Sequence, residues 1–374
     1  MMTQSGSRRL TRRALLGAGG GLALLALAGC GAASQATAPA GTATVAGTAP
    51  TVVASVPTQA VTTRTASAAS GAPAMVAASA TVAAPVARSA TAQTGGTRTV
   101  AHAMGETKVP LNPQRVVVLE EGPLNSALAL GVTPVGAVTA LAGTGYPEYL
   151  GEKAKGIKSV GLILEPNLEQ VAALQPDLII SVKSRHEKIY PQLAQIAPTV
   201  FSETLRGRWQ ANFAKDAEAL GKTTDADRLL ADYQRRMDDF KAQMGPARLQ
   251  ETLVSVVRFV PGDTYLYTKG SYIGLVLIDA GLRRPPAQDI NDFTVKLSEE
   301  QIQQIDGDVI FVTAYGPPDK TRQSNYQSNP LWQQLKAVQA NKVYTVNDEY
   351  WMVGIGILAA NRVADDLFKY FLNR

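Results

Sequence analysis

Short apolar segments alternate with amphipathic ones from about Thr99 onward. Apolar runs such as 115–119, 135–138 and 178–182 are typical of strands that are buried on both faces of a parallel sheet. The segments between them have helical spacing, and Gly or Pro residues follow several of them. The pattern predicts an α/β fold in which strands and helices follow one another along the chain.

The predicted strands cover residues 115–119, 135–138, 178–182, 199–201, 252–259, 264–267, 309–313 and 343–346. The predicted helices cover residues 123–130, 167–175, 187–196, 223–244, 274–280, 298–305 and 330–337, and a last helix begins at about Ile355. The helix over 223–244 is long and highly charged, and Gly245-Pro246 closes it. Because the alternation restarts after it, we expect an N-terminal lobe over 99–222, a connecting helix over 223–245 and a C-terminal lobe over 246–374.

A short internal sequence repeat supports two similar lobes. Residues 167–180 lie over residues 298–311 at a constant offset of 131, which pairs Glu169 with Glu300 and Asp177 with Asp308. Any amphipathic helix that leads into a buried strand would give the apolar matches, but it would not supply the paired acids. We therefore expect duplicated α/β lobes with a ligand cleft between them. A single connecting helix makes a stiff hinge, which predicts a small closure on binding.

The N-terminus has the features of an export signal. Four Arg residues precede an apolar run over 14–28 that is short for a bilayer span, and the run ends in Leu27-Ala28-Gly29-Cys30. This ending resembles a bacterial lipobox, which implies cleavage before Cys30 and lipidation of its thiol; an ordinary cleaved signal is the alternative. Residues 11–16 also resemble a twin-arginine signal, although a general secretory leader is positively charged too.

Residues 31–98 are almost entirely Ala, Thr, Ser, Val, Gly and Pro, without an aromatic or acidic residue. Such a segment lacks the large apolar side chains that offset chain entropy, so we expect a disordered tether between residues 1–30, the signal, and the folded lobes.

Charge and cysteine content exclude several classes of protein. The net charge of +5 resides in the leader and tether, because residues 1–98 hold seven Arg and no acid and leave 29 basic against 31 acidic residues from Thr99 onward. Nothing in this balance indicates nucleic acid. The single Cys excludes internal disulfides and cysteine-cluster metal sites.

Enzyme motifs are also lacking in the sequence. The two His residues are 84 positions apart and form no zinc motif. Residues 270–274 place Ser second rather than third, so they are not a nucleophile elbow. Residues 354–359 imitate a dinucleotide fingerprint, but too little chain follows for a strand and a ribose-binding acid. A binding protein fits better than an enzyme, with no intrinsic cofactor.

Several segments carry a family resemblance. Residues 108–119, 128–136, 166–179 and 258–274, together with Trp351 before the last helix, resemble the iron-siderophore substrate-binding proteins of ABC importers. The similarity covers nearly all of residues 99–374. It implies two Rossmann-like lobes bridged by one long helix, and a lipid-anchored extracytoplasmic monomer that passes a ferric siderophore to a permease dimer with a cytoplasmic ATPase.

The resemblance also gives residues their roles. It implies that Glu169 and Glu300, one on each lobe, dock into arginine pockets of the permease, where a partner with two-fold symmetry would accept one charge per lobe. The other explanation is that each acid only favours the first turn of its own helix.

Ferric siderophores often carry anionic oxygens, which Arg binds through its planar fork, while aromatic rings cover the organic backbone. The candidate ligand-binding residues are Arg185, Arg206, Arg208, Arg258, Tyr272, Tyr315 and Trp351, with Trp209 less well supported. Arg258 is the strongest candidate because it ends an apolar strand, where an unpaired charge would be costly; a structural salt bridge is the alternative for it, and solvated surface for the other Arg residues.

His186 is a candidate for completing iron coordination and His102 a weaker one, although a lone His is more often structural. The sequence thus predicts a siderophore receptor. Cobalamin or haem binding on the same fold, and a surface adhesion or sensor module, remain alternatives.

Overall fold

The structure is a computed structural model that describes residues 96–140, 145–205, 207–316 and 318–374. The expected signal with Cys30, and the expected tether up to residue 95, lie outside the described residues. From residue 96 the described chain belongs to one compact unit. Within it no helix is long and apolar enough to cross a membrane.

The N-terminal lobe is built on a six-stranded sheet with the order β6-β5-β4-β3-β7-β8. Its strands are β3 (Val116–Val118), β4 (Gly136–Thr139), β5 (Lys158–Leu162), β6 (Glu165–Pro166), β7 (Leu178–Val182) and β8 (Thr199–Ser202). All pairs are parallel except that of β5 with β6. Strands β3, β4, β7 and β8 are buried along their whole length, which explains their apolar sequences.

The helices of this lobe connect successive strands. They are α1 (Glu121–Ala129), η1 (Glu148–Ala154), α2 (Leu168–Ala173), α3 (Lys183–His186), η2 (Glu187–Ile189), α4 (Tyr190–Ile196) and α5 (Trp209–Leu220), where η marks a 3-10 helix. Helix α5 was not among the predicted helices.

A β-hairpin of β1 (Thr97–His102) and β2 (Gly105–Pro110) precedes the sheet. It begins two residues before the expected start of the lobe because Arg98 is part of the fold. Its guanidinium donates hydrogen bonds to the carbonyl oxygens of Glu218 (2.6 Å) and Ala219 (2.6 Å) at the C-terminal end of α5, where the helix dipole favours a cation.

The C-terminal lobe contains a five-stranded sheet with the order β11-β10-β9-β12-β13. Its strands are β9 (Val254–Val260), β10 (Asp263–Tyr267), β11 (Thr294–Lys296), β12 (Val309–Ala314) and β13 (Val343–Thr345). Strands β9, β12 and β13 are parallel, as expected, but β10 is antiparallel to both of its neighbours, β9 and β11. Only two residues join β9 to β10, and so short a turn can connect antiparallel strands alone.

The helices of this lobe are α7 (Pro246–Glu251), α8 (Tyr272–Asp279), η3 (Glu299–Ile305), η4 (Pro318–Lys320), α9 (Gln323–Ser328), η5 (Trp332–Gln334), α10 (Lys336–Gln339), η6 (Glu349–Val353, a π-helix) and α11 (Ile357–Leu372). The helix expected over 330–337 is divided in two because Leu335 is extended, with φ −64° and ψ 136°.

The two segments of the internal sequence repeat, 167–180 and 298–311, each form a short helix followed by a strand. Helix α2 leads into β7 and η3 leads into β12, and the two strands start at Leu178 and Val309. Each short helix has a side-chain cap at its start, from Asn167 and from Ser298.

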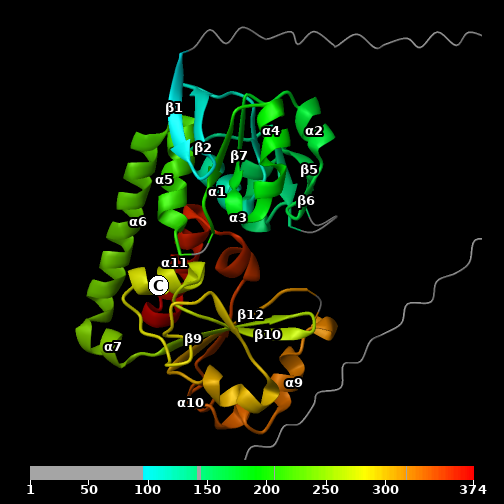
Figure 1. The fold of residues 1–374 in the computed structure, drawn as a ribbon. Coiled ribbons are helices and arrows are strands. Elements are labelled where there is room, and N and C mark those ends of the chain that lie inside the picture. The colour runs from blue at the N-terminus through cyan, green and yellow to red at the C-terminus, as the bar shows by residue number, and fades with distance from the viewer. Residues whose placement is uncertain (1–95, 141–144, 206, 317) are drawn as a thin grey trace, which may run out of the picture. The chain divides into compact units, whose positions relative to one another are not determined.

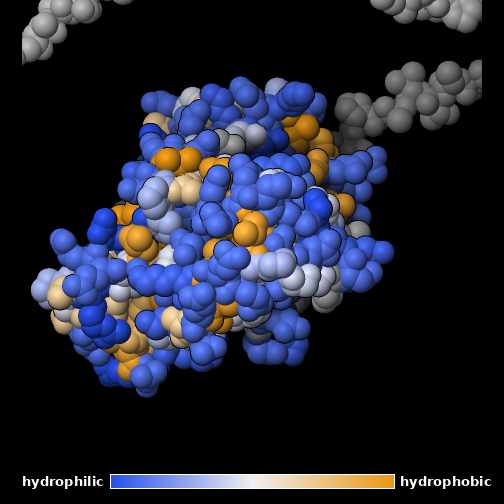
Figure 2. All heavy atoms as spheres, turned by 90° about the horizontal axis from the view of Figure 1, so that it is seen from below, coloured by the Kyte–Doolittle hydropathy of each residue, from blue (hydrophilic) through white to orange (hydrophobic). Residues whose placement is uncertain are grey.

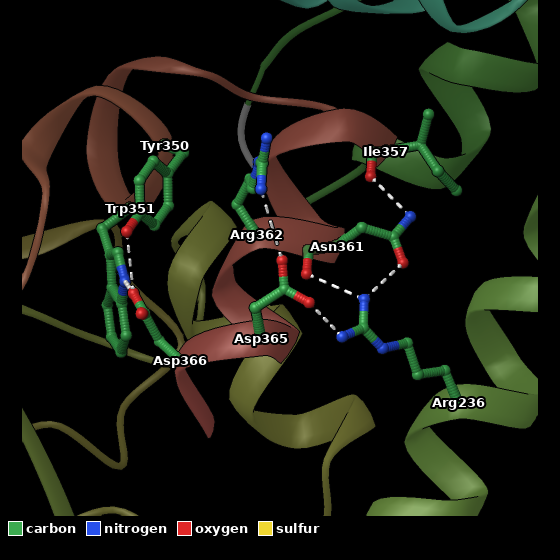
Figure 3. A network of polar contacts seen from close by, with 8 residues as sticks. All are labelled: Arg236, Tyr350, Trp351, Ile357, Asn361, Arg362, Asp365 and Asp366. Atoms are coloured by element: carbon green, nitrogen blue, oxygen red, sulfur yellow. Dashed lines mark hydrogen bonds and ion pairs between the residues drawn. The ribbon is translucent and has the colours of Figure 1, made fainter. Parts of the chain in front are cut away.

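Helix α6 (Thr223–Met244) connects the lobes, and α11 packs along it (Figure 1). Arg236 of α6 donates to the carbonyl oxygen of Asn361 (3.0 Å) and pairs with Asp365, both in α11 (Figure 3). Helix α11 also contacts α1 of the N-terminal lobe. One hydrophobic cluster consequently extends from Val100 in the hairpin to Leu367 in α11.

The surface is mostly hydrophilic on the face in Figure 2, with scattered apolar residues. The large apolar side chains that the described chain exposes are Leu111, Leu164, Ile278 and Ile290. Single exposed apolar residues of this kind are ordinary on soluble proteins.

Candidate functional site

A cleft of about 560 Å³ lies between the two lobes. Its lining residues are Glu120, Glu121, Ile163, Ser184, Arg185, Thr204 and Leu205 from the N-terminal lobe and Arg258, Tyr267, Phe293, Tyr315, Met352, Val353 and Ile355 from the C-terminal lobe. Most of them lie at or just after the carboxyl ends of strands β3, β5, β7, β8, β9, β10 and β12. Ligands of open α/β sheets bind at this edge, so the cleft is the candidate site.

Arg258 is the best-fixed cation of the cleft. Its Nε donates to Asp348 Oδ1 (2.7 Å), its Nη2 to Asp348 Oδ2 (2.5 Å) and its Nη1 to the hydroxyl of Tyr267 (3.0 Å). The guanidinium also lies 4.9 Å from the ring centre of Tyr315. Burial alone would lower the pKa of Arg258, but Tyr267 and Asp348 outweigh it and raise the pKa.

This arrangement agrees with the structural salt bridge that the sequence allowed for Arg258, whereas its contact with a ligand stays a prediction. The ion pair with Asp348 is structural, and only 13% of the arginine side chain is exposed. A guanidinium has five N–H donors, of which three bind Asp348 and Tyr267 in the described chain. Two N–H groups are therefore left for a ligand, in a fixed orientation.

Arg185 faces the cleft from α3. Its Nε donates to Glu120 Oε2 at 2.9 Å, and the two side chains are 38% and 3% exposed. Glu120 is the N-cap of α1 and accepts from the N–H of Glu121 as well. The nearly buried acid thus holds Arg185 at the rim of the cleft.

Glu121 is a buried carboxyl group of the cleft lining that has no compensating partner among the described residues. It is 3% exposed, and neither of its carboxyl oxygens has a hydrogen-bond partner within the described residues. Burial, and then the neighbouring acids Glu120 and Glu349, raise its pKa from 4.5 to about 8. The cleft accordingly has a neutral, buried carboxyl group at pH 7.

Tyr315 lies in the cleft as expected, whereas Trp351 and Tyr272 do not reach its surface. Trp351 is fully buried, its ring centre lies 4.5 Å from that of Phe311, and its indole N–H donates to Asp366 (Figure 3). Tyr272 is 3% exposed and donates its hydroxyl to the carbonyl oxygen of Gly356. Both aromatic residues belong to the core that supports the cleft.

Of the two remaining arginine candidates, the structure describes only Arg208. Arg206 lies outside the described residues. Arg208 is exposed at the start of α5 and is not among the lining residues. Trp209, which follows it, is 2% exposed and packs edge to face on Tyr233.

Both His residues are held by the protein itself. The Nε2 of His186 lies 2.6 Å from the carbonyl oxygen of Ile163 and its Nδ1 2.7 Å from the hydroxyl of Ser181. A carbonyl oxygen only accepts, so Nε2 carries the proton and neither nitrogen is left for iron. Burial lowers the pKa of His186, which keeps the ring neutral. The Nε2 of His102 lies 2.8 Å from the hydroxyl of Thr107 in the hairpin.

Glu169 and Glu300 occupy equivalent places on the two lobes. Each is the second residue of a short helix, α2 or η3, and each is exposed. A hydrogen bond from Ser298 lowers the pKa of Glu300, so this acid is charged at neutral pH. The two lobes present one comparable carboxylate each.

Sequence reasoning missed the acidic residues of the site. Glu120 and Glu121 directly follow the apolar run over 115–119, which is the position where a parallel strand delivers its residues to the ligand edge. That signal was available. Asp348 had no local signal, because its partner Arg258 lies 90 positions away.

A second hollow, of about 310 Å³, is less suited to binding. It is lined by Asp308 and Val309 at the start of β12 and by Lys342 just before β13, and thus lies at the amino ends of the strands. Among the described residues, no three His, Cys, Asp or Glu are placed to hold a metal ion.

Comparisons with known proteins agree with this architecture. The family model described as "Periplasmic binding protein" matches residues 116–350. The probable siderophore-binding lipoprotein YfiY of Bacillus subtilis is 41% identical over 289 residues, which are 74% of this chain and 88% of that protein. The Fe(3+)-citrate-binding protein YfmC of the same organism is 32% identical, over 76% of this chain and 89% of YfmC.

Solved structures give the same result. Staphylococcus aureus SirA, complexed with staphyloferrin B, superposes with a TM-score of 0.67 at 34% identity and covers 74% of this chain and 98% of SirA. Together with the match over 116–350 and the 41% identity to YfiY, this shows that the chain belongs to the periplasmic binding protein family.

Proposed function

We propose that this chain captures a ferric siderophore or a related ferric carboxylate between its lobes and delivers it to the permease of an ABC importer, which a separate ATPase drives. The observation that carries the proposal is the interlobe cleft with Arg258 fixed near the carboxyl end of β9. Its support from relatives is that YfiY and YfmC are named for siderophore and ferric citrate binding, and that SirA was solved in complex with staphyloferrin B.

The cleft suits an organic iron chelate with anionic oxygens. The two N–H groups left on Arg258 can receive a carboxylate or a similar oxygen anion in a charge-assisted pair. Tyr267, Phe293 and Tyr315 supply aromatic surface for the carbon skeleton of the ligand. The hydroxyl groups of Ser184 and Thr204 line the other side.

A titration of the purified protein tests this proposal. Ferric citrate, a ferric hydroxamate, a ferric catecholate, haem and cyanocobalamin are added in turn, and binding is followed by calorimetry. We expect tight binding of an iron complex and none of its iron-free form. If only cyanocobalamin or haem bound, that compound and not a siderophore would be the ligand. If none of the compounds bound, a surface adhesion or sensor module would be favoured.

We further propose that Glu169 and Glu300 dock the loaded protein on the permease. The support is their equivalent, exposed placement at the start of α2 and η3. Replacing both with Ala is expected to abolish iron uptake by cells while the dissociation constant of the ligand stays unchanged. The matched control replaces Glu187 and Asp319, exposed acids of the two lobes, and should leave uptake intact. Equal loss of uptake and ligand affinity in the double variant would contradict docking.

The membrane anchor is a separate proposal. Cys30 at the end of the lipobox is expected to carry a lipid that holds the protein on the extracytoplasmic face of the cell membrane. Cys30→Ser should move the protein from the membrane fraction to the soluble extracytoplasmic fraction. Retention of the variant on membranes would contradict the anchor.

A further inference from the structure

The first turn of α1 places a buried carboxyl group without a counter-ion at the lining of the cleft. Glu121 lines the cleft, is 3% exposed and leaves both carboxyl oxygens without a hydrogen-bond partner among the described residues. A buried carboxyl group without partners is costly, and such groups are found mainly where a ligand or a function requires them.

The surroundings of Glu121 have an excess of negative charge. Glu120 precedes it and is compensated by Arg185. Glu349, from η6, accepts the backbone N–H of Glu148 and raises the pKa of Glu121 by repulsion. The other titratable groups that interact with Glu121 are Tyr146, Tyr149 and Tyr315, whose own pKa values it raises.

The neighbouring cations are already engaged. Arg185 is bound to Glu120 at 2.9 Å, and Arg258 is bound to Asp348 through two hydrogen bonds. Each cleft arginine thus has its own acid, and Glu121 is an additional negative charge once it ionises. The wall at α1 is complementary to a cationic group of the ligand, while the C-terminal lobe offers the N–H donors of Arg258 to an anionic one.

We propose that Glu121 is a subsite for a protonated amine of the bound iron complex. This inference rests on the proposed function and specifies the ligand as a chelate that carries an ammonium group as well as anionic oxygens. The ammonium donates to the carboxylate of Glu121, and the oxygens accept from Arg258. A charge-assisted bond in a buried position is the stronger type of hydrogen bond, so the ammonium group contributes directly to selectivity.

Binding of the amine is linked to a proton. In the empty cleft Glu121 is mostly protonated at pH 7, because its pKa is about 8. An ammonium group binds the ionised form, so the carboxyl proton leaves to solvent when the ligand enters. The advantage of an amine-bearing ligand consequently grows as the pH rises from 6 to 8. If a protonated Glu121 instead donated to a ligand oxygen, affinity would fall as the pH rises above 8.

Two matched probes test the subsite. The first is the ferric complex of citrate joined through one terminal carboxyl to ethylenediamine, which leaves a free primary amine. The second is the same complex with that amine acetylated. Ferric citrate serves as the reference, and dissociation constants are measured by calorimetry at pH 6, 7 and 8 in two buffers of different ionisation enthalpy.

We expect the free-amine complex to bind the native protein at least tenfold more tightly than the acetylated complex at pH 8, with a smaller ratio at pH 6. Its binding at pH 7 should release close to one proton. Glu121→Gln keeps the shape of the side chain and should remove both the preference and the proton release, while affinity for the acetylated complex stays within threefold. Glu187→Gln, an exposed control, should change nothing.

The outcomes separate this inference from the proposed function. Equal affinity for the two probes, with ferric citrate bound, overturns the amine subsite and leaves the function standing. An equal loss of affinity for both probes in Glu121→Gln also overturns the amine subsite and indicates a direct contact of Glu121 with the iron. Failure of every iron complex to bind overturns the proposed function and this inference with it.

Discussion

The buried carboxyl group of Glu121 is expected to contribute to the dependence of stability on pH. The carboxyl group has a pKa of about 8 in the folded protein against an ordinary value of 4.5, chiefly because it is buried. The folded state therefore binds the proton more tightly than the unfolded state, so the free energy of unfolding decreases as the pH rises from 4.5 towards 8. The ideal slope is about 1.4 kcal/mol per pH unit, with an upper limit of roughly 5 kcal/mol above pH 8.

Glu121→Gln removes this titration and keeps the size of the side chain. Partial entry of water lowers the ideal effect, so we expect the variant to be about 2–4 kcal/mol more stable than the native protein at pH 8. Near pH 4.5 the difference should fall below about 1 kcal/mol, because both side chains are then largely neutral. Below that pH the ionisation of residue 121 no longer changes the free energy of unfolding of the native protein or of the variant.

Urea unfolding at pH 5, 6, 7 and 8, followed by far-ultraviolet circular dichroism, measures the difference directly. Glu187→Gln is the control, because it removes one exposed acid in the same lobe. A difference between Glu121→Gln and the native protein that is constant over this range would refute the reasoning. So would a native protein that is the more stable of the two at pH 8.

Three further predictions concern Arg258 in the cleft and two residues adjacent in sequence to lining residues. Gly356→Ala should lower the free energy of unfolding by about 2–4 kcal/mol in urea, because the added Cβ would lie 2.6 Å from Asn125 Oδ1; an effect below about 1 kcal/mol would contradict this. Arg258→Lys should weaken binding of ferric citrate about tenfold or more by calorimetry, because Lys cannot keep the two bonds to Asp348 and present further N–H groups; unchanged affinity would exclude Arg258 as a contact. His186→Gln should reduce the loss of stability between pH 6.5 and pH 5, because burial lowers the pKa of this His and its protonation opposes folding; equal losses in both proteins would show that the ring does not titrate there.

The elements that could be predicted from sequence are those whose burial is uniform. Strand β7 coincides with the predicted 178–182, and α6 with the predicted 223–244, because a fully buried strand is apolar throughout and a long exposed helix is periodic. Helix α5 was missed because its buried face includes a charged residue, Asp216, as well as Trp209 and Phe213. A buried acid breaks the pattern of apolar positions.

The site was harder to predict than the fold, for a physical reason. Arg258 was recognised because a charge near the end of an apolar strand is unusual, and Tyr315 follows β12 directly; both positions are close to the ligand edge. Trp351 and Tyr272 also follow apolar or loop segments, but both are buried. Trp351 packs on Phe311 and donates to Asp366, and Tyr272 packs on Trp209 and donates to Gly356. That packing joins residues far apart in sequence, so local patterns do not reveal which aromatic residues stay accessible.

The position of α11 has a consequence for how the protein folds. Asn125 of α1 accepts a hydrogen bond from the N–H of Leu358, which lies 233 residues later. The N-terminal lobe therefore cannot complete its packing while it emerges from the ribosome, and at ordinary synthesis rates α1 waits roughly 10–50 s for its partner. The last helix of the chain is thus needed to complete the packing of a helix in the first lobe.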